Sequence, residues 1–145
     1  MPENEQLPKV GLGVIIVDNN GHILIGKRKG VLSPYYSIPG GHLEIGETFE
    51  EGAIREIKEE TNLEIQDPEV VVVTNNLRTY KESGAHYVSI VLLAQNFSGE
   101  LKNMEPHKCE EYLWCDPAEL PTPHFDASER GVKCYLENKF YNKFE

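Results

Sequence analysis

The sequence predicts an α/β fold in which a mixed, partly antiparallel sheet lies between helices. Three observations lead to this prediction. Strand-like apolar segments open the chain, an acidic amphipathic helix follows them, and further strands precede a second amphipathic helix near the C-terminus. Elements in this order bury their apolar surfaces when the sheet is sandwiched between the helices.

The first part of the chain is expected to form two strands and a bend. Residues 10–17 (VGLGVIIV) read as a buried strand, and residues 22–28 (HILIGKR) read as a second one. The turn at residues 18–21 joins them, so a hairpin is predicted. A loop over residues 29–37 then leads into a tight bend at residues 38–41.

The acidic helix is expected to begin at Thr48 and to end near Asn62. Thr48 and Glu51 have the spacing of a capping box, in which each residue satisfies a free amide of the other. Ala53, Ile54 and Ile57 fall on a different side of the helix from Glu56 and Glu60, so the helix is expected to pack its apolar side and to present its acids.

The second half is expected to contain two long strands, a last strand and a final helix. A short strand at residues 63–65 precedes long strands at 70–80 and 86–97, the second of them central in the sheet. Residues 110–115 form the last strand, with Trp114 in the core. The final helix begins after Asp126, with an apolar stripe made of Val132, Tyr135, Leu136 and Phe140.

Length and composition predict one domain over residues 9–145 after a flexible N-terminus at residues 1–8. The sequence contains no run of about 18 apolar residues, so it predicts no membrane span. The N-terminus does not resemble a signal peptide. Three cysteines without a paired spacing favour a reduced, cytoplasmic protein. A net charge of −10 argues against binding a nucleic-acid polymer, although a mononucleotide with its metal ions stays compatible.

The glutamates of the acidic helix predict a metal site. Glu56 and Glu60, four residues apart, stack on one face of a helix, and Glu59 flanks them. Such carboxylates repel one another unless a cation lies among them, and oxygen ligands of this kind suit Mg²⁺ or Mn²⁺. The alternative is a solvated helix with Glu/Lys pairs, but it explains neither the preceding Gly40–Gly41 pair nor the glutamate spacing.

The segment GHLEIGETFEEGAIREIKEETNL resembles the Nudix box, G-x5-E-x7-R-E-U-x-E-E-x-G-U, where U is a bulky apolar residue. The matching residues are Gly41, Glu47, Arg55, Glu56, Ile57, Glu59, Glu60 and Leu63. Asn62 stands where the family has glycine, and asparagine is the next most tolerant residue at a helix end with positive φ. The resemblance implies the α/β/α Nudix sandwich and hydrolysis of a nucleoside diphosphate linked to another group.

The same resemblance implies roles for individual residues. Glu56 and Glu60 are the main metal ligands, with Glu59 and the Gly40 carbonyl as additions. Arg55 orients a neighbouring carboxylate, and Glu47 is an accessory metal carboxylate. Family members differ in the general base, and the candidates outside the box are Glu105 and Glu110, which otherwise read as solvated loop acids.

Further segments resemble small MutT-homologue nucleoside triphosphate diphosphatases, which act on modified guanine nucleotides. These segments are GKRKG, PGGHLE, HYVSI, NMEPHKCE and GVKC. The resemblance implies a homodimer and a substrate site made of Arg28, Ile38, Gly41, Ser89, Gly131 and Val132, with Arg28 at the phosphates. Glu129 and Arg130 depart from the subgroup, which has aromatic residues there.

Two alternative functions stay open at this point. One is the same chemistry on a nucleotide sugar, ADP-ribose or a dinucleoside polyphosphate, for which Tyr80 is a weak signal. The other is a non-catalytic nucleotide sensor, which the intact set of glutamates disfavours.

Overall fold

The computed structural model describes residues 6–30 and 33–143. Its main sheet has the strand order β4–β1–β7–β6. β1 (Lys9–Ile16) runs parallel to β7 (Tyr87–Ala94) and antiparallel to β4 (Gly40–His42). β6 (Glu69–Asn75) pairs antiparallel with β7 and forms the other edge. The sheet is therefore mixed and partly antiparallel, as the sequence predicts.

Two smaller sheets complete the strand arrangement. β2 (Ile23–Arg28) lies between β3 (Tyr36–Ser37) and β9 (Cys109–Cys115), and both pairings are antiparallel. β5 (Glu64–Gln66) pairs with β8 (Asn96–Ser98). β9 matches the predicted last strand, and its Trp114 stacks on Phe97 at the margin of the core with ring centroids 5.7 Å apart.

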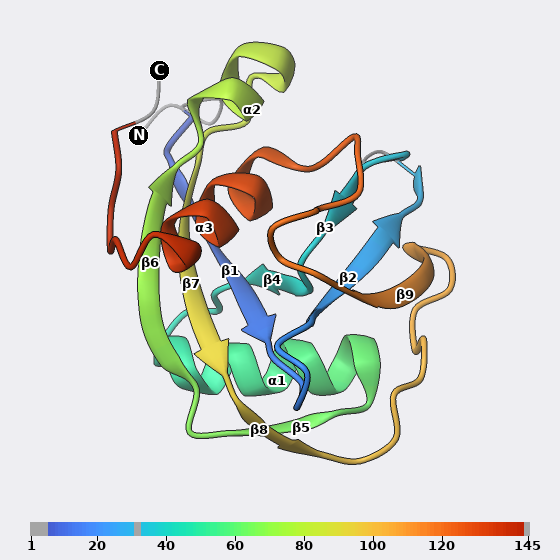
Figure 1. Ribbon diagram of the computed structural model, residues 1–145. Helices are drawn as coiled ribbons and strands as arrows, with labels where there is room; N and C mark the ends of the chain where they lie inside the picture. Colours follow the sequence, from blue (N-terminus) through green and yellow to red (C-terminus); the bar gives the residue numbers. More distant parts are fainter. Residues whose placement is uncertain (1–5, 31–32, 144–145) are drawn as a thin grey trace.

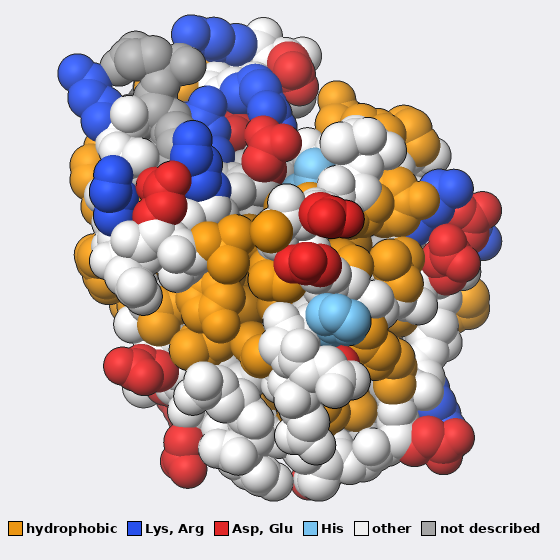
Figure 2. All heavy atoms as spheres, viewed as in Figure 1, with side chains coloured by type: hydrophobic (Ala, Val, Ile, Leu, Met, Phe, Trp, Pro, Cys, Tyr) orange, Lys and Arg blue, Asp and Glu red, His pale blue; other side chains and the backbone are white. Residues whose placement is uncertain are grey.

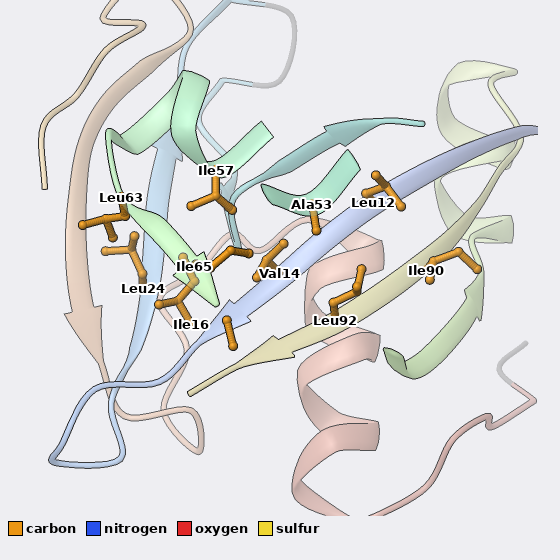
Figure 3. Close-up of a cluster of buried hydrophobic side chains, with 11 residues drawn as sticks. Leu12, Val14, Ile16, Leu24, Ala53, Ile57, Leu63, Ile65, Ile90 and Leu92 are labelled. Atoms are coloured by element: carbon orange, nitrogen blue, oxygen red, sulfur yellow. The ribbon is translucent and has the colours of Figure 1, made fainter. Parts of the chain in front are cut away.

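Helices cover both faces of the main sheet (Figure 1). Helix α1 (Phe49–Thr61) lies behind the strands, and helix α3 (Asp126–Leu136) crosses in front of β6 and β7. Side chains of β1 alternate between these helices, as the pleat of a strand requires. Leu12, Val14 and Ile16 join Ala53 and Ile57 of α1 in one buried cluster (Figure 3). Ile15 joins Val132 and Cys134 of α3 in a second cluster.

The acidic helix has the predicted ends. Thr48 is the N-cap, and its hydroxyl accepts from the Glu51 amide while the Glu51 carboxylate accepts from the Thr48 amide. Asn62 caps the C-terminus with φ 68°, the left-handed conformation that the family glycine would also adopt. The departure at Asn62 thus leaves the end of α1 intact.

The predicted hairpin between the first two strands is wrong. β1 has β4 on one edge and β7 on the other, so neither edge is free for β2. The two strands meet only at the bridge between Val17 and Ile23, and β2 then enters the sheet with β9. A short connection brings strands close, but the remaining pairings of the chain decide which edges they share.

The two predicted long strands are each broken. The strand expected over residues 70–80 ends at Asn75, and helix α2 (Leu77–Ser83) follows it. The strand expected over residues 86–97 divides into β7, which is central as predicted, and β8, which leaves to pair with β5. Tyr80 consequently lies on a helix rather than on a strand, and it is exposed.

The predicted stripe of the final helix is correct only in part. Val132 is buried and Tyr135 is half-buried, but Leu136 and Phe140 are exposed. α3 ends at Leu136, so Phe140 no longer follows its periodicity.

The flexible stretch expected at residues 1–8 lies mostly outside the described residues. In the described ranges, no helix is long and apolar enough to cross a membrane.

Candidate active site

Arg55 joins three acidic residues in one hydrogen-bonded network. Its Nε and Nη2 donate to the two oxygens of Glu47 at 2.7 and 3.0 Å. Its Nη1 donates to Glu56 Oε1 at 2.8 Å and lies 3.5 Å from Glu59 Oε2. Its Nη2 also donates to the His42 carbonyl at 3.0 Å. A paired, charge-assisted contact of this kind is strong and directional, so Arg55 holds Glu47 and Glu56 in place.

The network also fixes the charges of its members. The hydrogen bond from Arg55 lowers the pKa of Glu47 to about 2, and the Glu44 amide adds to this effect. Glu47 in turn raises the pKa of Arg55 above its ordinary value. Glu59 shares Arg55 Nη1 with Glu56, but its contact is longer and its side chain is exposed.

Glu60 lies one helical turn after Glu56 and is only 5% exposed. Its Oε2 is buried and has no hydrogen-bond partner among the described residues. Burial, followed by the charge of Glu56, raises the pKa of Glu60 to about 8. Arg28 and the Gly40 amide oppose this rise, and Glu105 adds to it. The carboxylate therefore lacks the positive charge that burial of an anion requires.

The pair Gly40 and Gly41 lets β4 pass between β1 and α1. A Cβ on Gly40 would lie 1.9 Å from the Leu12 carbonyl oxygen, and a Cβ on Gly41 would lie 2.3 Å from the Glu56 carboxylate. At Gly40 the obstacle is backbone, so glycine is required there. At Gly41 a side chain would displace the carboxylate of Glu56. The backbone of β4 is thereby held directly against the carboxylate of Glu56.

Glu56 and Glu60 fit a divalent cation by their chemistry. Both offer carboxylate oxygens, and the unpartnered Oε2 of Glu60 is a free ligand position. Hard oxygen donors of this kind suit Mg²⁺ or Mn²⁺. Within the described ranges, no three His, Cys, Asp or Glu side chains already stand close enough to hold a metal ion together.

A cavity of about 370 Å³ adjoins the same glycines. Its lining includes Gly40 and four residues predicted to bind substrate, namely Arg28, Ile38, Gly41 and Ser89. Gly11 and Gly13 of β1 also line it, so the strand contributes backbone without side chains. Arg28 has a buried Nε without a hydrogen-bond partner in the described part of the chain. Arg28, Gly40 and Gly41 thus belong both to the cavity and to the surroundings of Glu56 and Glu60.

Gly131 and Val132, which are predicted to contact the base, are not among the residues that line this cavity. Both are buried against the sheet, where a Cβ on Gly131 would lie 3.0 Å from Val91 and Val132 packs in the second core cluster. The face of α3 that carries them is occupied by the core. Phe125, Ala127 and Ser128, around the start of α3, line the cavity instead.

Two polar residues of the cavity wall have no recognisable sequence signal. Asn76 is buried, and its amide donates to Ser89 Oγ at 2.8 Å. Ser128 Oγ accepts from the Ile38 amide at 2.9 Å and lies 2.6 Å from His124 Nε2. His124 is buried, which lowers its pKa, so its neutral ring supports Ser128 and Ile38. These contacts join positions far apart in the chain, which no local pattern reveals.

The structure separates the two candidates for the general base. Glu105 acts on the pKa of Glu60 and is half-buried, with Lys108 at 3.8 Å. Glu110 instead pairs with Lys27 at 3.0 Å and is half-exposed on β9. Of these two candidates, Glu105 is the one that lies near Glu60.

Comparison with known proteins agrees with this geometry. Residues 7–135 match the family model of the NUDIX domain. The chain belongs to the Nudix family. It is a Nudix hydrolase that acts on pyrophosphate bonds, with a MutT-like fold.

Individual relatives differ in their described substrates. An ADP-ribose pyrophosphatase of Methanocaldococcus jannaschii is 34% identical over 91% of this chain and 75% of its own. A human 8-oxo-dGDP phosphatase is 31% identical over 79% of this chain, which spans only 34% of that protein. The crystal structure of a MutT Nudix hydrolase from Burkholderia pseudomallei has a TM-score of 0.80 and 31% identity, covering 88% of this chain and 98% of its own.

Replacing Glu47 tests the network around Arg55. We expect Glu47→Gln to lower activity by about 10- to 100-fold, because Arg55 loses its charged partner and releases Glu56. Glu44→Gln is the matched control, since Glu44 is exposed and lies 3.7 Å from Arg55. Steady-state rates of both variants would be compared with the parent; equal losses in the two would contradict a specific role for Glu47.

Metal binding is expected to release a proton from Glu60. With a pKa of about 8, Glu60 is mostly protonated at pH 7 in the metal-free protein, and a bound cation requires its ionised form. We expect release of about one proton per bound Mg²⁺ at pH 7, and an affinity that rises with pH up to about 8. Calorimetry in two buffers of different ionisation enthalpy measures this number, and a value near zero would contradict the assignment.

Proposed function

We propose that the protein is a Mg²⁺-dependent nucleoside triphosphate diphosphatase. It would hydrolyse (deoxy)nucleoside triphosphates, including oxidised or otherwise modified guanine nucleotides, to a monophosphate and pyrophosphate. The observation that carries this proposal is the sharing of Arg28, Gly40 and Gly41 between the cavity and the carboxylate pair. A nucleoside in the cavity would thereby direct its phosphates towards Glu56 and Glu60.

The proposed roles follow from charge and position. Glu56 and Glu60 would hold Mg²⁺ or Mn²⁺, with Glu59 and the Gly40 carbonyl as further ligands. The bound ion supplies neutralisation of the phosphate charge and activation of a water. Arg28 offers a buried guanidinium nitrogen without a protein partner, which suits a phosphate oxygen.

The general base in this proposal is Glu105. Its charge acts on Glu60, which supports a role for Glu105 beside the proposed metal ligands. Glu110 is the less favoured candidate for the general base, because it forms an ion pair with Lys27. Arg55 and Glu47 would act by positioning Glu56 rather than by contact with substrate.

The size of the cavity favours a single nucleotide. A volume of about 370 Å³ lies at the lower end of the range for small-molecule sites, roughly 300–1,000 Å³. The cavity therefore suits one nucleoside better than the two halves of a dinucleoside polyphosphate. A second candidate function is hydrolysis of ADP-ribose, which the similarity to the archaeal pyrophosphatase favours.

Other predictions from the sequence remain proposals. They are a single domain over residues 9–145, a homodimer, a cytoplasmic location and no binding of nucleic-acid polymers. The residues Ile38, Gly41 and Ser89 are proposed to contact the nucleoside, since all three line the cavity. A sensor without activity is disfavoured, because a binding module does not require the buried, unpartnered carboxylate oxygen of Glu60.

A nucleotide panel with Mg²⁺ tests the proposal. We expect pyrophosphate from nucleoside triphosphates, fastest with guanine forms, and little turnover of ADP-ribose or a dinucleoside tetraphosphate. Turnover of ADP-ribose alone would retain the metal site and overturn the substrate assignment. An absence of turnover with every compound of the panel would favour the non-catalytic nucleotide sensor.

A paired substitution tests the metal ligand in the same assay. We expect Glu60→Gln to reduce turnover by at least about 100-fold, because the neutral amide is a poor metal ligand. Glu50→Gln, on the same helix, is the control, since Glu50 is exposed and forms no hydrogen bond or ion pair with the described residues. A Glu60→Gln variant with parental activity would contradict the assignment.

A further inference from the structure

Helix α2 forms part of the cavity wall without being anchored in the core. Thr79 and Ser83 of α2 line the cavity, together with Asn76 before it. None of the helix residues, all of which are described, is buried. In Figure 1, α2 stands at the top of the molecule, beyond the helices that cover the sheet. Polar contacts therefore contribute to its position, beside the half-buried Leu77 and the ring contact between Tyr80 and His86.

The start of α2 is capped from another helix. Asn76 is the N-cap residue, but its side chain makes no capping bond and instead contacts Thr74 and Ser89. The backbone amide of Thr79, in the first turn of α2, donates to Asp126 Oδ2 of α3 at 3.1 Å, and Asp126 is only 2% exposed. An amide in the first turn of a helix needs such a partner. The contact ties α2 to the first residue of α3.

Arg78 supplies the second connection between these helices. Its Nη1 donates to Glu129 Oε1 at 3.0 Å, and its Nη2 donates to the His124 carbonyl at 3.1 Å. Its Nε lies 3.9 Å from Asp126 Oδ1. Basic and acidic side chains are interspersed over this part of the surface (Figure 2).

The α2–α3 polar cluster consists of Arg78, Thr79, Asp126 and Glu129. Glu129 belongs to the pair of residues that departs from the aromatic residues of the MutT-homologue subgroup. In this chain, the glutamate at position 129 forms an ion pair with Arg78 of α2. Partly exposed ion pairs of this kind are weak, so α2 can shift without unfolding the sheet.

We propose that the α2–α3 polar cluster holds α2 as an adjustable wall of the nucleotide cavity, with Arg78 as the positioning residue that restricts the cavity to small nucleotides. The inference rests on the proposed function, because it takes the cavity as the nucleoside site. Arg78 itself does not line the cavity, so it acts on substrate only through the position of Thr79 and Ser83.

The variant Arg78→Gln removes the connection, and Lys81→Gln is its matched control. Lys81 lies on the same helix, is exposed, and has no hydrogen bond or ion pair with the described residues. We expect Arg78→Gln to raise KM for a nucleoside triphosphate by about 5- to 10-fold with kcat changed less than about 2-fold, because only uniform binding is lost. Lys81→Gln should leave both constants at the parental values.

Two further measurements separate positioning from a general loss of structure. Hydrogen exchange of residues 77–83 should be faster in Arg78→Gln, while exchange in α1 stays unchanged. Glu129→Gln removes one of the three contacts of Arg78, so it should change KM and exchange in the same direction by a smaller factor. The double variant should add little to Arg78→Gln. A dinucleoside tetraphosphate should inhibit Arg78→Gln at least as well as the parent, because a displaced wall admits a larger ligand.

The outcomes are distinguishable from failure of the proposed function. If the parent hydrolyses no triphosphate, the proposed function fails, and the wall is tested by hydrogen exchange and by the dissociation constant of the triphosphate. Faster exchange with an unchanged KM or dissociation constant would overturn the inference, since α2 would then move without effect on binding. Unchanged exchange in Arg78→Gln would overturn it as well, since other contacts would then hold the helix.

Discussion

The close passage of Gly40 and Gly41 between β1 and α1 is the contact on which the site depends. A side chain at Gly40 would collide with the Leu12 carbonyl, and one at Gly41 would collide with the Glu56 carboxylate. Because both are glycine, the backbone that borders the cavity also touches the acidic helix. The position of the cavity relative to the glutamates of α1 is therefore set by the pairing of β4 with β1 in the main sheet.

Electrostatics gives this arrangement its chemical character. One guanidinium, Arg55, fixes Glu47 and Glu56, but no described cation forms an ion pair with the buried carboxylate of Glu60. Burial and the nearby charge of Glu56 therefore raise the pKa of Glu60, because too little positive charge lies close to its carboxylate. Arg28 offsets only part of that deficit. In the proposed function, a divalent cation would supply the remaining positive charge.

The sequence alone predicts the features that depend on local spacing. The capping box of Thr48, the left-handed Asn62 and the i, i+4 relation of Glu56 and Glu60 all follow from positions along one helix. The features that failed depend on distant contacts. Nothing near residues 10–28 shows that β4 and β7 occupy both edges of β1, and the valine-rich start of β6 conceals the helix that follows it.

The candidate site divides in the same way. Arg28, Ile38, Gly41 and Ser89 were predicted from matched segments, and they line the cavity. Gly131 and Val132 were predicted from the same resemblance, but the core occupies their face of α3. The contributions of Asn76 and Ser128 come from hydrogen bonds across 13 and 90 residues of sequence, which only the folded chain brings together.

A structure with Mn²⁺ and a non-hydrolysable nucleoside triphosphate tests the central claim most directly, because anomalous scattering identifies the ion. The account predicts Mn²⁺ bound by Glu56 and Glu60, the phosphates beside Arg28 and Gly40, and the nucleoside in the cavity against β1. Mn²⁺ bound away from both glutamates, or a nucleoside outside the cavity, would contradict it.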